Sequence, residues 1–385
     1  MALLEQLLSA FKGGEETRVP LAPGIMQGWT PAFADAGGSK PYQYERCVRE
    51  GFLSNPIAQR AVRIVAEGVG QAPISSNDDK LAALINATSA GQSLIETLAA
   101  HLMLHGNGFV QIVKDASGQP IELFALRPDR VKVLAGQDGW PCAYTYSVVG
   151  EEITLPIEDE DGWPSVIQIK TMHPLDDHLG TSALAAARQA VAIHNAASEW
   201  NRALLENAAR PSGALVYEPG DNSGLTHEQF ERLKSELEAA FSGSGNAGRP
   251  MLLDGGLRWQ SMAMSPADMD FATLKSAAAR DIALAFGVPP MLLGLPGDNT
   301  YSNYREANRA LWRLTLLPLA EKLFSALQEG LSPWFSGSSI SVDLDRITAL
   351  SEDRERLWKQ VSDADFLTRA EKRELLGFEP QEDVQ

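Results

Sequence analysis

The stretch Asp281–Asn303 reads DIALAFGVPPMLLGLPGDNTYSN, and the rest of the chain is organised around it. It begins as the end of an amphipathic helix. That helix must stop at Gly287-Val288-Pro289-Pro290, because proline lacks a backbone donor and restricts the residue before it. The apolar run Met291–Leu293 is expected to anchor in a core. A polar, glycine-rich loop follows, and a new helix starts near Ser302. Such loops often carry function, although a buried turn and a plain linker explain the same residues.

The composition argues against several classes of protein. The 385 residues carry 33 basic and 50 acidic side chains, a net charge of −17, so a conventional nucleic-acid-binding face is not expected. No apolar run approaches the ~20 residues of a membrane span, and no signal peptide is visible. Cys47 and Cys142 are far apart, which indicates free thiols in a reducing compartment. We therefore expect a soluble protein made in the cytoplasm.

The first half of the chain combines helices with a β-rich region. Residues 12–41 are rich in Gly and Pro and predict an extended arm after a short helix at Met1–Phe11. Apolar periodicity predicts helices at Ala58–Val69 and Leu94–Leu104. Alternating or apolar runs predict five strands: Phe109–Lys114, Ile121–Leu126, Arg130–Leu134, Ala143–Val149 and Val166–Thr171.

The second half contains two long helices around a small insert. Ser182–Ala209 has a mostly alanine stripe with helical period, which suits close approach of a partner helix. A second helix begins at Ser265-Pro266 and runs to Phe286. The insert Gly213–Met262 predicts strand Ala214–Tyr217, a helix capped by Thr226, and strands Met251–Leu253 and Arg258–Ser261.

After the loop, Tyr304–Gly330 predicts a helix kinked at Pro318. A strand is expected at Ile340–Leu344 and two short helices at Ser351–Leu376. The fold class is α+β.

Two motifs suggest chemistry but lack the right context. Gly243–Gly248 spells GxGxxG, yet a helix precedes it and a strand follows, the reverse of a dinucleotide site. The segment His173-Pro-Leu-Asp176-Asp177-His178 could seed a metal site, but its spacing is not helical and a loop at a strand end explains it better. No nucleophile motif is present, so we expect no enzyme, no cofactor and no metal.

The order of several short motifs resembles the portal proteins of tailed bacteriophages, in the branch shared with gene transfer agents. The second-half motifs are Asn207–Gly213, Asn246–Gly248, Leu253–Gly256, Ile282–Pro290, Leu293-Gly294 and Thr300–Asn303. The first-half motifs are Leu104–Asn107, Leu126–Asp129, His173 and Gly180-x-Ser182. The resemblance covers about residues 45–345.

This resemblance implies a portal fold with a wing, a stem, a clip and a small crown, assembling as a ring of twelve subunits around a channel. The implied segments are arm 1–41, wing 42–181, stem helix 182–210, clip 211–263, stem helix 264–287, tunnel loop 288–303, second wing part 304–350 and crown 351–385.

Three groups of site residues follow when the loop, its apolar foot and the two helix stripes are placed on this fold. The DNA-facing tunnel loop is Gly297, Asp298, Asn299, Thr300 and Tyr301. Its anchor is Val288, Pro289, Pro290 and Leu293. The residues expected to pack the stem helices are Ala190, Ile193, Ala197, Trp200, Leu204, Phe271, Leu274 and Ala278.

The implied partners are further copies of the chain, double-stranded DNA held without sequence specificity, the large terminase, a head–tail adaptor and the major capsid protein, with no membrane. The implied location is one vertex of the capsid. Two alternatives remain open: a metal-dependent hydrolase using His173, Asp176, Asp177 and His178, and a helical scaffold unrelated to phage.

Overall fold

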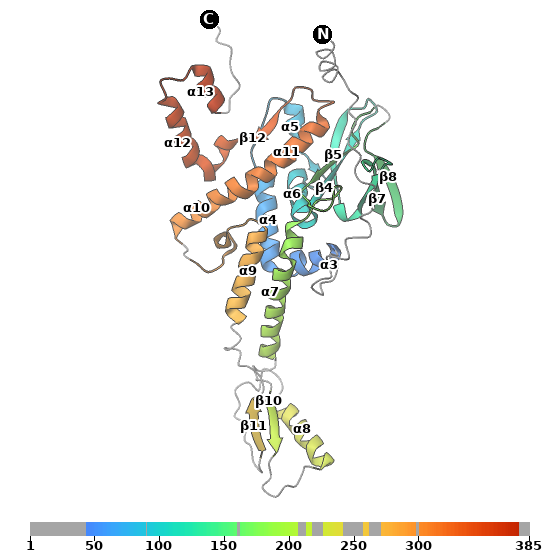
Figure 1. Ribbon diagram of the computed structural model, residues 1–385, viewed down its shortest axis with the longest axis vertical. Coiled ribbons are helices and arrows are strands. Elements are labelled where there is room, and N and C mark those ends of the chain that lie inside the picture. The colour runs from blue at the N-terminus through green and yellow to red at the C-terminus, as the bar shows by residue number, and fades with distance from the viewer. Residues whose placement is uncertain are drawn as a thin grey trace, which may run out of the picture. The chain divides into compact units, whose positions relative to one another are not determined.

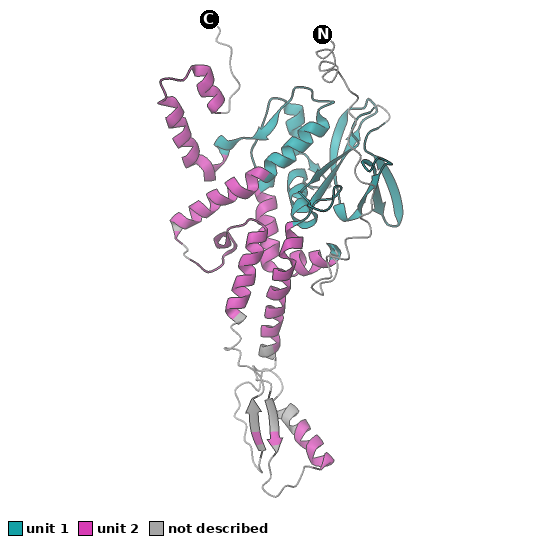
Figure 2. Ribbon diagram, in the orientation of Figure 1, with its two compact units in different colours: residues 1–45, 69–182, 319–346 teal, residues 46–68, 183–318, 347–385 magenta. Residues whose placement is uncertain are grey.

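The computed structural model describes residues 44–89, 91–159, 162–206, 213–217, 226–241, 257–261, 271–297 and 300–376. The chain divides into two compact units that alternate along the sequence (Figure 2). Unit 1 comprises residues 1–45, 69–182 and 319–346, and unit 2 comprises residues 46–68, 183–318 and 347–385. The predicted arm, the GxGxxG motif and the predicted strand Met251–Leu253 lie outside the described residues.

Unit 1 holds the β-rich region, in which two antiparallel three-stranded sheets have the orders β5-β4-β9 and β6-β7-β8 (Figure 1). A further pair joins β1 (Ile74–Ser76) to β12 (Ile340–Val342), and the short β2 (Thr88–Ser89) pairs with β3 (Gln92–Ser93). The six strands of the larger sheets are β4 Asn107–Lys114, β5 Pro120–Leu126, β6 Val131–Ala135, β7 Pro141–Val148, β8 Glu151–Pro156 and β9 Val166–Lys170. The five predicted strands are confirmed, and β8 was missed.

Two helices of unit 1 begin at side-chain caps. The carboxylate of Asp78 accepts from the backbone N–H of Lys80 and Leu81 at the start of α5 (Asp79–Asn86), a helix that the sequence analysis missed. Ser93 caps α6 (Leu94–His105), which ends at Gly106 with a φ of 83°. This confirms the helix predicted at Leu94–Leu104 and its glycine stop.

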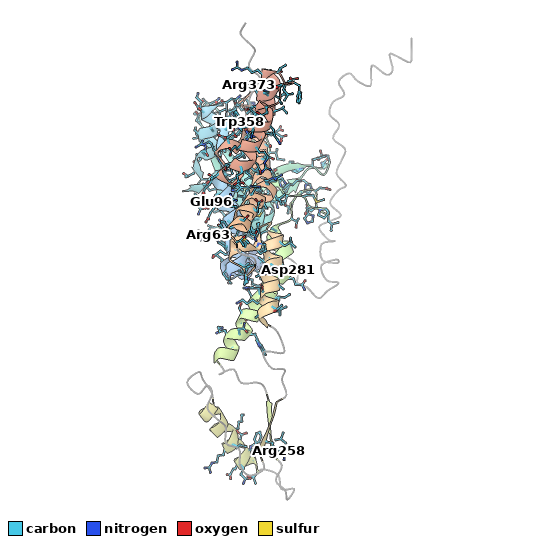
Figure 3. The ribbon with its side chains drawn as sticks, turned by 90° about the vertical axis from the view of Figure 1, so that its left-hand side faces the viewer. Arg63, Glu96, Arg258, Asp281, Trp358 and Arg373 are labelled. Atoms are coloured by element: carbon cyan, nitrogen blue, oxygen red, sulfur yellow. The ribbon has the colours of Figure 1, made fainter. Side chains whose placement is uncertain are left out.

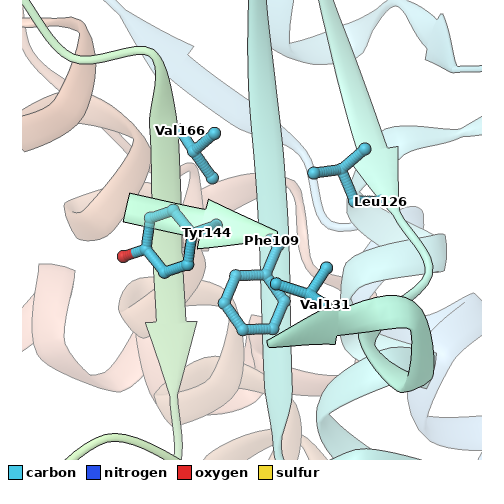
Figure 4. Close-up of a cluster of buried hydrophobic side chains, with 5 residues drawn as sticks. All are labelled: Phe109, Leu126, Val131, Tyr144 and Val166. Carbon is cyan, nitrogen blue, oxygen red and sulfur yellow. The ribbon is translucent and has the colours of Figure 1, made fainter. Parts of the chain in front are cut away.

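One cluster of buried aromatic and aliphatic side chains in unit 1 joins residues of the two larger sheets (Figure 4). Phe109 on β4 and Tyr144 on β7 meet edge to face with ring centroids 5.5 Å apart. Leu126, Val131 and Val166 complete the cluster from three other strands or their ends. Burial raises the pKa of Tyr144 to about 12, so its hydroxyl stays neutral and donates to Gln168.

The turn after α6 explains why two separated motifs, Leu104–Asn107 and Gly180-x-Ser182, belong together. The Asn107 amide accepts from the N–H of Gly180 at 2.8 Å and donates to the carbonyl of Gly180. The carbonyl of Gly106 accepts from Thr171 N–H. A Cβ at Gly106 would lie 2.5 Å from the Thr181 backbone, so only glycine fits.

Unit 2 is mostly helical. It holds α7 (Ala183–Glu206) and α9 (Phe271–Ala285), which contact each other along their lengths, and most of α4 (Pro56–Gly70). Before α4 come α3 (Tyr44–Val48), shared with unit 1, and the π-helical turn Arg49–Leu53. On α4 the predicted stripe Ala58, Ala61, Val62, Val65 and Val69 is buried, as expected. The long helix predicted at Ser182–Ala209 is also confirmed.

The insert and the C-terminal segments of unit 2 match their predictions where they are described. Strands β10 (Gly213–Tyr217) and β11 (Leu257–Ser261) pair antiparallel. Helix α8 (His227–Phe241) begins at Thr226, which exchanges hydrogen bonds with Gln229 as a capping box. The two predicted short tail helices are α12 (Ser351–Ser362) and α13 (Arg369–Leu375).

The helix after the loop is continuous but irregular. It comprises α10 (Tyr301–Leu311), a π-helical turn at Trp312–Leu316, and α11 (Leu317–Leu331). The helix was predicted to kink at Pro318, and the irregularity is instead the π-helical turn that precedes this proline. Proline lacks an N–H and its ring conflicts with the carbonyl four residues earlier, and a π turn relieves both constraints.

We expect Gly106→Ala to lower the free energy of unfolding well below that of Gly118→Ala. Both glycines have nearly the same positive φ, 83° and 79°, so each variant bears the backbone strain of about 1–2 kcal/mol. Only at Gly106 does the added methyl meet backbone, and this should cost a further 2 kcal/mol or so. Urea denaturation followed by tryptophan fluorescence measures the difference. Equal losses would show that the Thr181 contact is not tight.

Candidate functional site

The loop that joins α9 to α10 is fixed at its base by buried residues on both sides of a glycine. Phe286 and Val288 are each 2% exposed, and Gly287 between them has a φ of 65°. The N–H of Val288 donates to the carbonyl of Ala283, which closes the helix C-terminus. The hydroxyl of Thr315 donates to the carbonyl of Gly287 at 2.7 Å, so the helix after the loop also holds the base.

The predicted anchor is therefore partly wrong. Val288 is buried, but Pro289 and Leu293 are half-buried and Pro290 is exposed. Met291–Leu293, expected in a core, forms the short 3₁₀-helix Pro290–Leu293 with no fully buried residue. The buried residues at this base are Phe286 and Val288, which flank the turn at Gly287, so the apolar character of Met291–Leu293 did not by itself place that run in the core.

Two further contacts hold the loop, one just before and one just after its exposed middle. The Arg280 guanidinium on α9 donates to the carbonyl of Pro296 at 2.6 Å. At the other end the Thr300 hydroxyl accepts from Asn303 N–H and caps α10. Between these points Gly297 is exposed, and a Cβ there would meet nothing within 4 Å. Asp298, Asn299 and the side chain of Tyr301 lie outside the described residues.

Arginines on the helix after the loop bind the acidic start of α12. Arg305 and Arg309 both contact the carboxylate of Glu352, at 2.5 and 2.7 Å. Arg309, with a side chain 17% exposed, and Arg313 also approach Asp353. These residues recur every four positions on one face of the helix, so α12 is tied to the segment that the loop leads into.

The stem residues predicted from the alanine stripe are only partly buried in one chain. Ala197 and Ala278 are buried, Ala190 and Ile193 are half-buried, and Trp200 and Leu274 are each 45% exposed. The side chains of Leu204 and Phe271 lie outside the described residues. The interior face of α7 is instead Leu184, Ala187, Val191, His194 and Ala197. Alanine is found on nearly every face of this helix, so the pattern did not single out one face.

A buried polar contact on α7 was missed. Asn55 is 1% exposed; its amide oxygen accepts from the N–H of Ile57 and Ala58 at the start of α4. Its amide nitrogen lies 3.1 Å from His194 Nδ1 and donates to Asn195. Burial, and then the charge of Lys275, lowers the pKa of His194, so the ring stays neutral. An asparagine just before Pro56 was the available signal of a helix cap.

The metal-site alternative finds no support in the part of the chain that is described. Asp176 accepts from the N–H of His178 and Leu179, and His173 accepts from Leu175 N–H, so these side chains stabilise their own loop. No group of three or more potential ligands converges among the described residues.

None of the described helices has the length and apolar content that a membrane crossing requires.

The comparisons agree with this geometry. The family model described as phage portal protein matches residues 56–377. The chain belongs to the phage portal protein family. It is therefore a portal protein, the head–tail connector of a phage or gene-transfer-agent particle, and the hydrolase and unrelated-scaffold alternatives are not supported.

The chain is also similar to proteins of known sequence and to chains of solved structures. An uncharacterized protein of Rickettsia bellii is 38% identical, with 86% of this chain and 88% of that protein covered. The probable portal protein of Streptomyces phage phiC31 is 30% identical over 62% of this chain and 52% of its own. A chain in the virion of a native gene transfer agent particle is 44% identical, with 91% and 98% covered and a TM-score of 0.68.

Proposed function

We propose that twelve copies of this portal protein form a ring around a channel, through which double-stranded DNA enters the capsid and later leaves it. A chain in the neck of a native gene transfer agent particle, computed with C12 symmetry, supports this number: it is 45% identical over 91% of this chain and 98% of its own, with a TM-score of 0.68. The acidic composition also suits a channel that DNA traverses without adhering, because fixed anionic walls repel phosphate.

The segments take the roles that the family resemblance implies. Residues 182–210 and 264–287 form the stem and 211–263 form the clip. Residues 42–181 and 304–350 form the wing, and 351–385 form a small crown. The α7–α9 pair and the separate β10–α8–β11 insert are what a stem and a clip require.

The loop 288–303 is the proposed constriction of the channel. The observation that carries this role is the contrast between its ends and its middle. Phe286, Val288 and the Arg280–Pro296 contact hold the ends, while Gly297 and Thr300 are polar or small and exposed. Such a loop can touch a passing duplex without losing its place in the subunit.

The proposed partners are the large terminase and then the head–tail adaptor at the clip, and the major capsid protein around the wing. The role of the chain is structural, and ATP hydrolysis belongs to the terminase. The protein is made in the bacterial cytoplasm and ends at one vertex of the virion.

Deletion of Gly297–Thr300 should leave ring assembly intact and reduce the DNA retained per particle. The described contacts of these residues fall within the loop and the cap of α10, so the subunit fold does not depend on them. Ring mass by native mass spectrometry and nuclease-protected DNA per particle are the two readouts. Thr300→Ala is the matched control, because it removes only the helix cap. Loss of rings in the deletion would make the loop structural.

Trp200→Asp should abolish the ring, because this exposed indole is then replaced by a charge where a neighbouring subunit is expected to pack. Trp200→Phe, which keeps an apolar ring, should still assemble. Sedimentation velocity separates monomer from ring. An unchanged oligomeric mass in Trp200→Asp would rule out Trp200 as a stem contact.

A further inference from the structure

A chain of three polar side chains joins the start of α4 to the middle of α7. Asn195 donates from its side-chain amide to the backbone carbonyl of Glu50 at 2.9 Å. The amide oxygen of Asn195 accepts from the side chain of Asn55 at 2.8 Å. The same Asn55 nitrogen lies 3.1 Å from Nδ1 of His194, a residue only 5% exposed. Water therefore has little access to the last of these contacts.

The backbone fixes the orientation of both amides in this chain. A carbonyl such as that of Glu50 can only accept, which identifies the atom of Asn195 that faces it as the nitrogen. At the other end, two backbone N–H groups at the start of α4 can only donate, and both lie 3.0 Å from the Asn55 oxygen. The Asn55 amide therefore cannot be reversed, and its NH₂ group must face His194.

An NH₂ group in this position requires an acceptor on the imidazole. Nδ1 of His194 accepts only when it carries no proton, so the ring must be neutral with its proton on Nε2. A protonated ring has a donor on both nitrogens, and the Nδ1–H would then meet the Asn55 NH₂ donor to donor. Neither amide can turn to relieve this conflict without losing its bonds to the backbone. The contact therefore exists only with a neutral ring.

The facing helix α9 adds no group that would stabilise a proton on this ring. Burial, and then the positive charge of Lys275 on α9, lowers the pKa of His194. The carboxylate of Asp281, six positions further along α9, is exposed to solvent (Figure 3). The charge that α9 presents to the ring therefore opposes protonation.

The neighbouring carboxylates on the other two elements are bound to other cations. Glu50, before α4, contacts Arg46 at 2.6 Å, and Glu199 on α7 lies 3.7 Å from Arg202. In the part of the chain that is described, no carboxylate forms an ion pair with His194. An imidazolium formed here would thus be buried beside a donor and without a counter-charge.

We propose that His194 is a pH-sensitive lock between the start of α4 and the middle of α7, closed by the neutral ring and opened by its protonation. The apolar part of the same joint does not titrate: a Cβ at Gly51 would lie 2.6 Å from Leu184, so this backbone and the leucine are in close contact. Opening is therefore local to the polar chain. Both sides of the lock belong to unit 2, and the lock does not depend on the proposed ring.

The pH range in which the lock opens follows from the direction of the pKa shift. In the closed state the pKa of His194 lies below its ordinary value of 6.5, so the lock is fully closed above that pH. Below pH 6.5 the open state binds the proton more readily than the closed state does. The ratio of open to closed molecules then rises by up to about tenfold for each pH unit, until the pKa of the closed state is reached.

Hydrogen–deuterium exchange of the full chain from about pH 8 to about pH 5 tests the lock, with rates corrected for the intrinsic pH dependence of amide exchange. Peptides that cover residues 54–62 and 190–200 should lose protection as the pH falls below 6.5. His227→Gln removes an exposed histidine on α8 and is the matched control. It should show the same loss as the unsubstituted chain.

Two variants separate the lock from a purely structural contact. His194→Gln offers Asn55 an acceptor oxygen that does not titrate, so the protection should stay constant over the whole range. Asn55→Asp should reverse the dependence. Its carboxylate can still cap α4, and its second oxygen attracts the protonated ring, so protection should rise as the pH falls.

A loss of protection at low pH that persists in His194→Gln would overturn the proposal. Unchanged protection of the unsubstituted chain below pH 6.5 would do the same. If Asn55→Asp lost protection at low pH as the unsubstituted chain does, the assigned directions of the hydrogen bonds would be wrong. Native mass spectrometry of the same samples reports the ring separately, so the lock and the ring can fail independently.

Discussion

The geometry of the loop depends on one constraint, the helix stop at Phe286-Gly287-Val288. Gly287 adopts a left-handed conformation that a side chain would strain, and a Cβ there would lie 2.7 Å from the Thr315 hydroxyl. Because the chain turns at this point, both flanking apolar residues can enter the interior. The loop therefore leaves a firm point on α9 and returns to a capped helix. The length and polarity of the loop can therefore suit a function without changing how the buried residues at its base pack.

How far the sequence predicts this structure depends on how local each signal is. The caps at Ser93 and Thr226 and the glycine stop at Gly106 are local, and the elements they bound were expected. Strand β8 was missed although Ile153 and Leu155 alternate with polar residues in its sequence. The turn that joins it to β7 is also local, because Val149 and Gly150 both have a positive φ and Val148 pairs with Glu151.

The errors in the candidate site concern which residues of a segment turn inward. The run Met291–Leu293 is the most apolar part of the loop, yet Phe286 and Val288 are the buried anchors. Hydrophobicity indicates that a segment can be buried, but backbone geometry at glycine and proline decides which residues turn inward. Likewise, α7 carries alanine on most of its faces, so its periodicity could not distinguish the face toward α9 from the opposite one. The cap that Asn55 forms at the start of α4 had a local signal that was overlooked, whereas its contacts with His194 and Asn195, about 140 positions away, had none.

The alanine content of α7 has a physical use that a single subunit does not explain. An isolated helical pair gains most stability from large residues at one interface, and its solvent face is usually polar. Here small residues extend to the outer face, where burial of an alanine contributes little within the subunit. They allow a second helix to approach as closely as the first. The proposed stem role gives this property a use, because a stem helix in the proposed ring lies between two neighbours and packs on both sides.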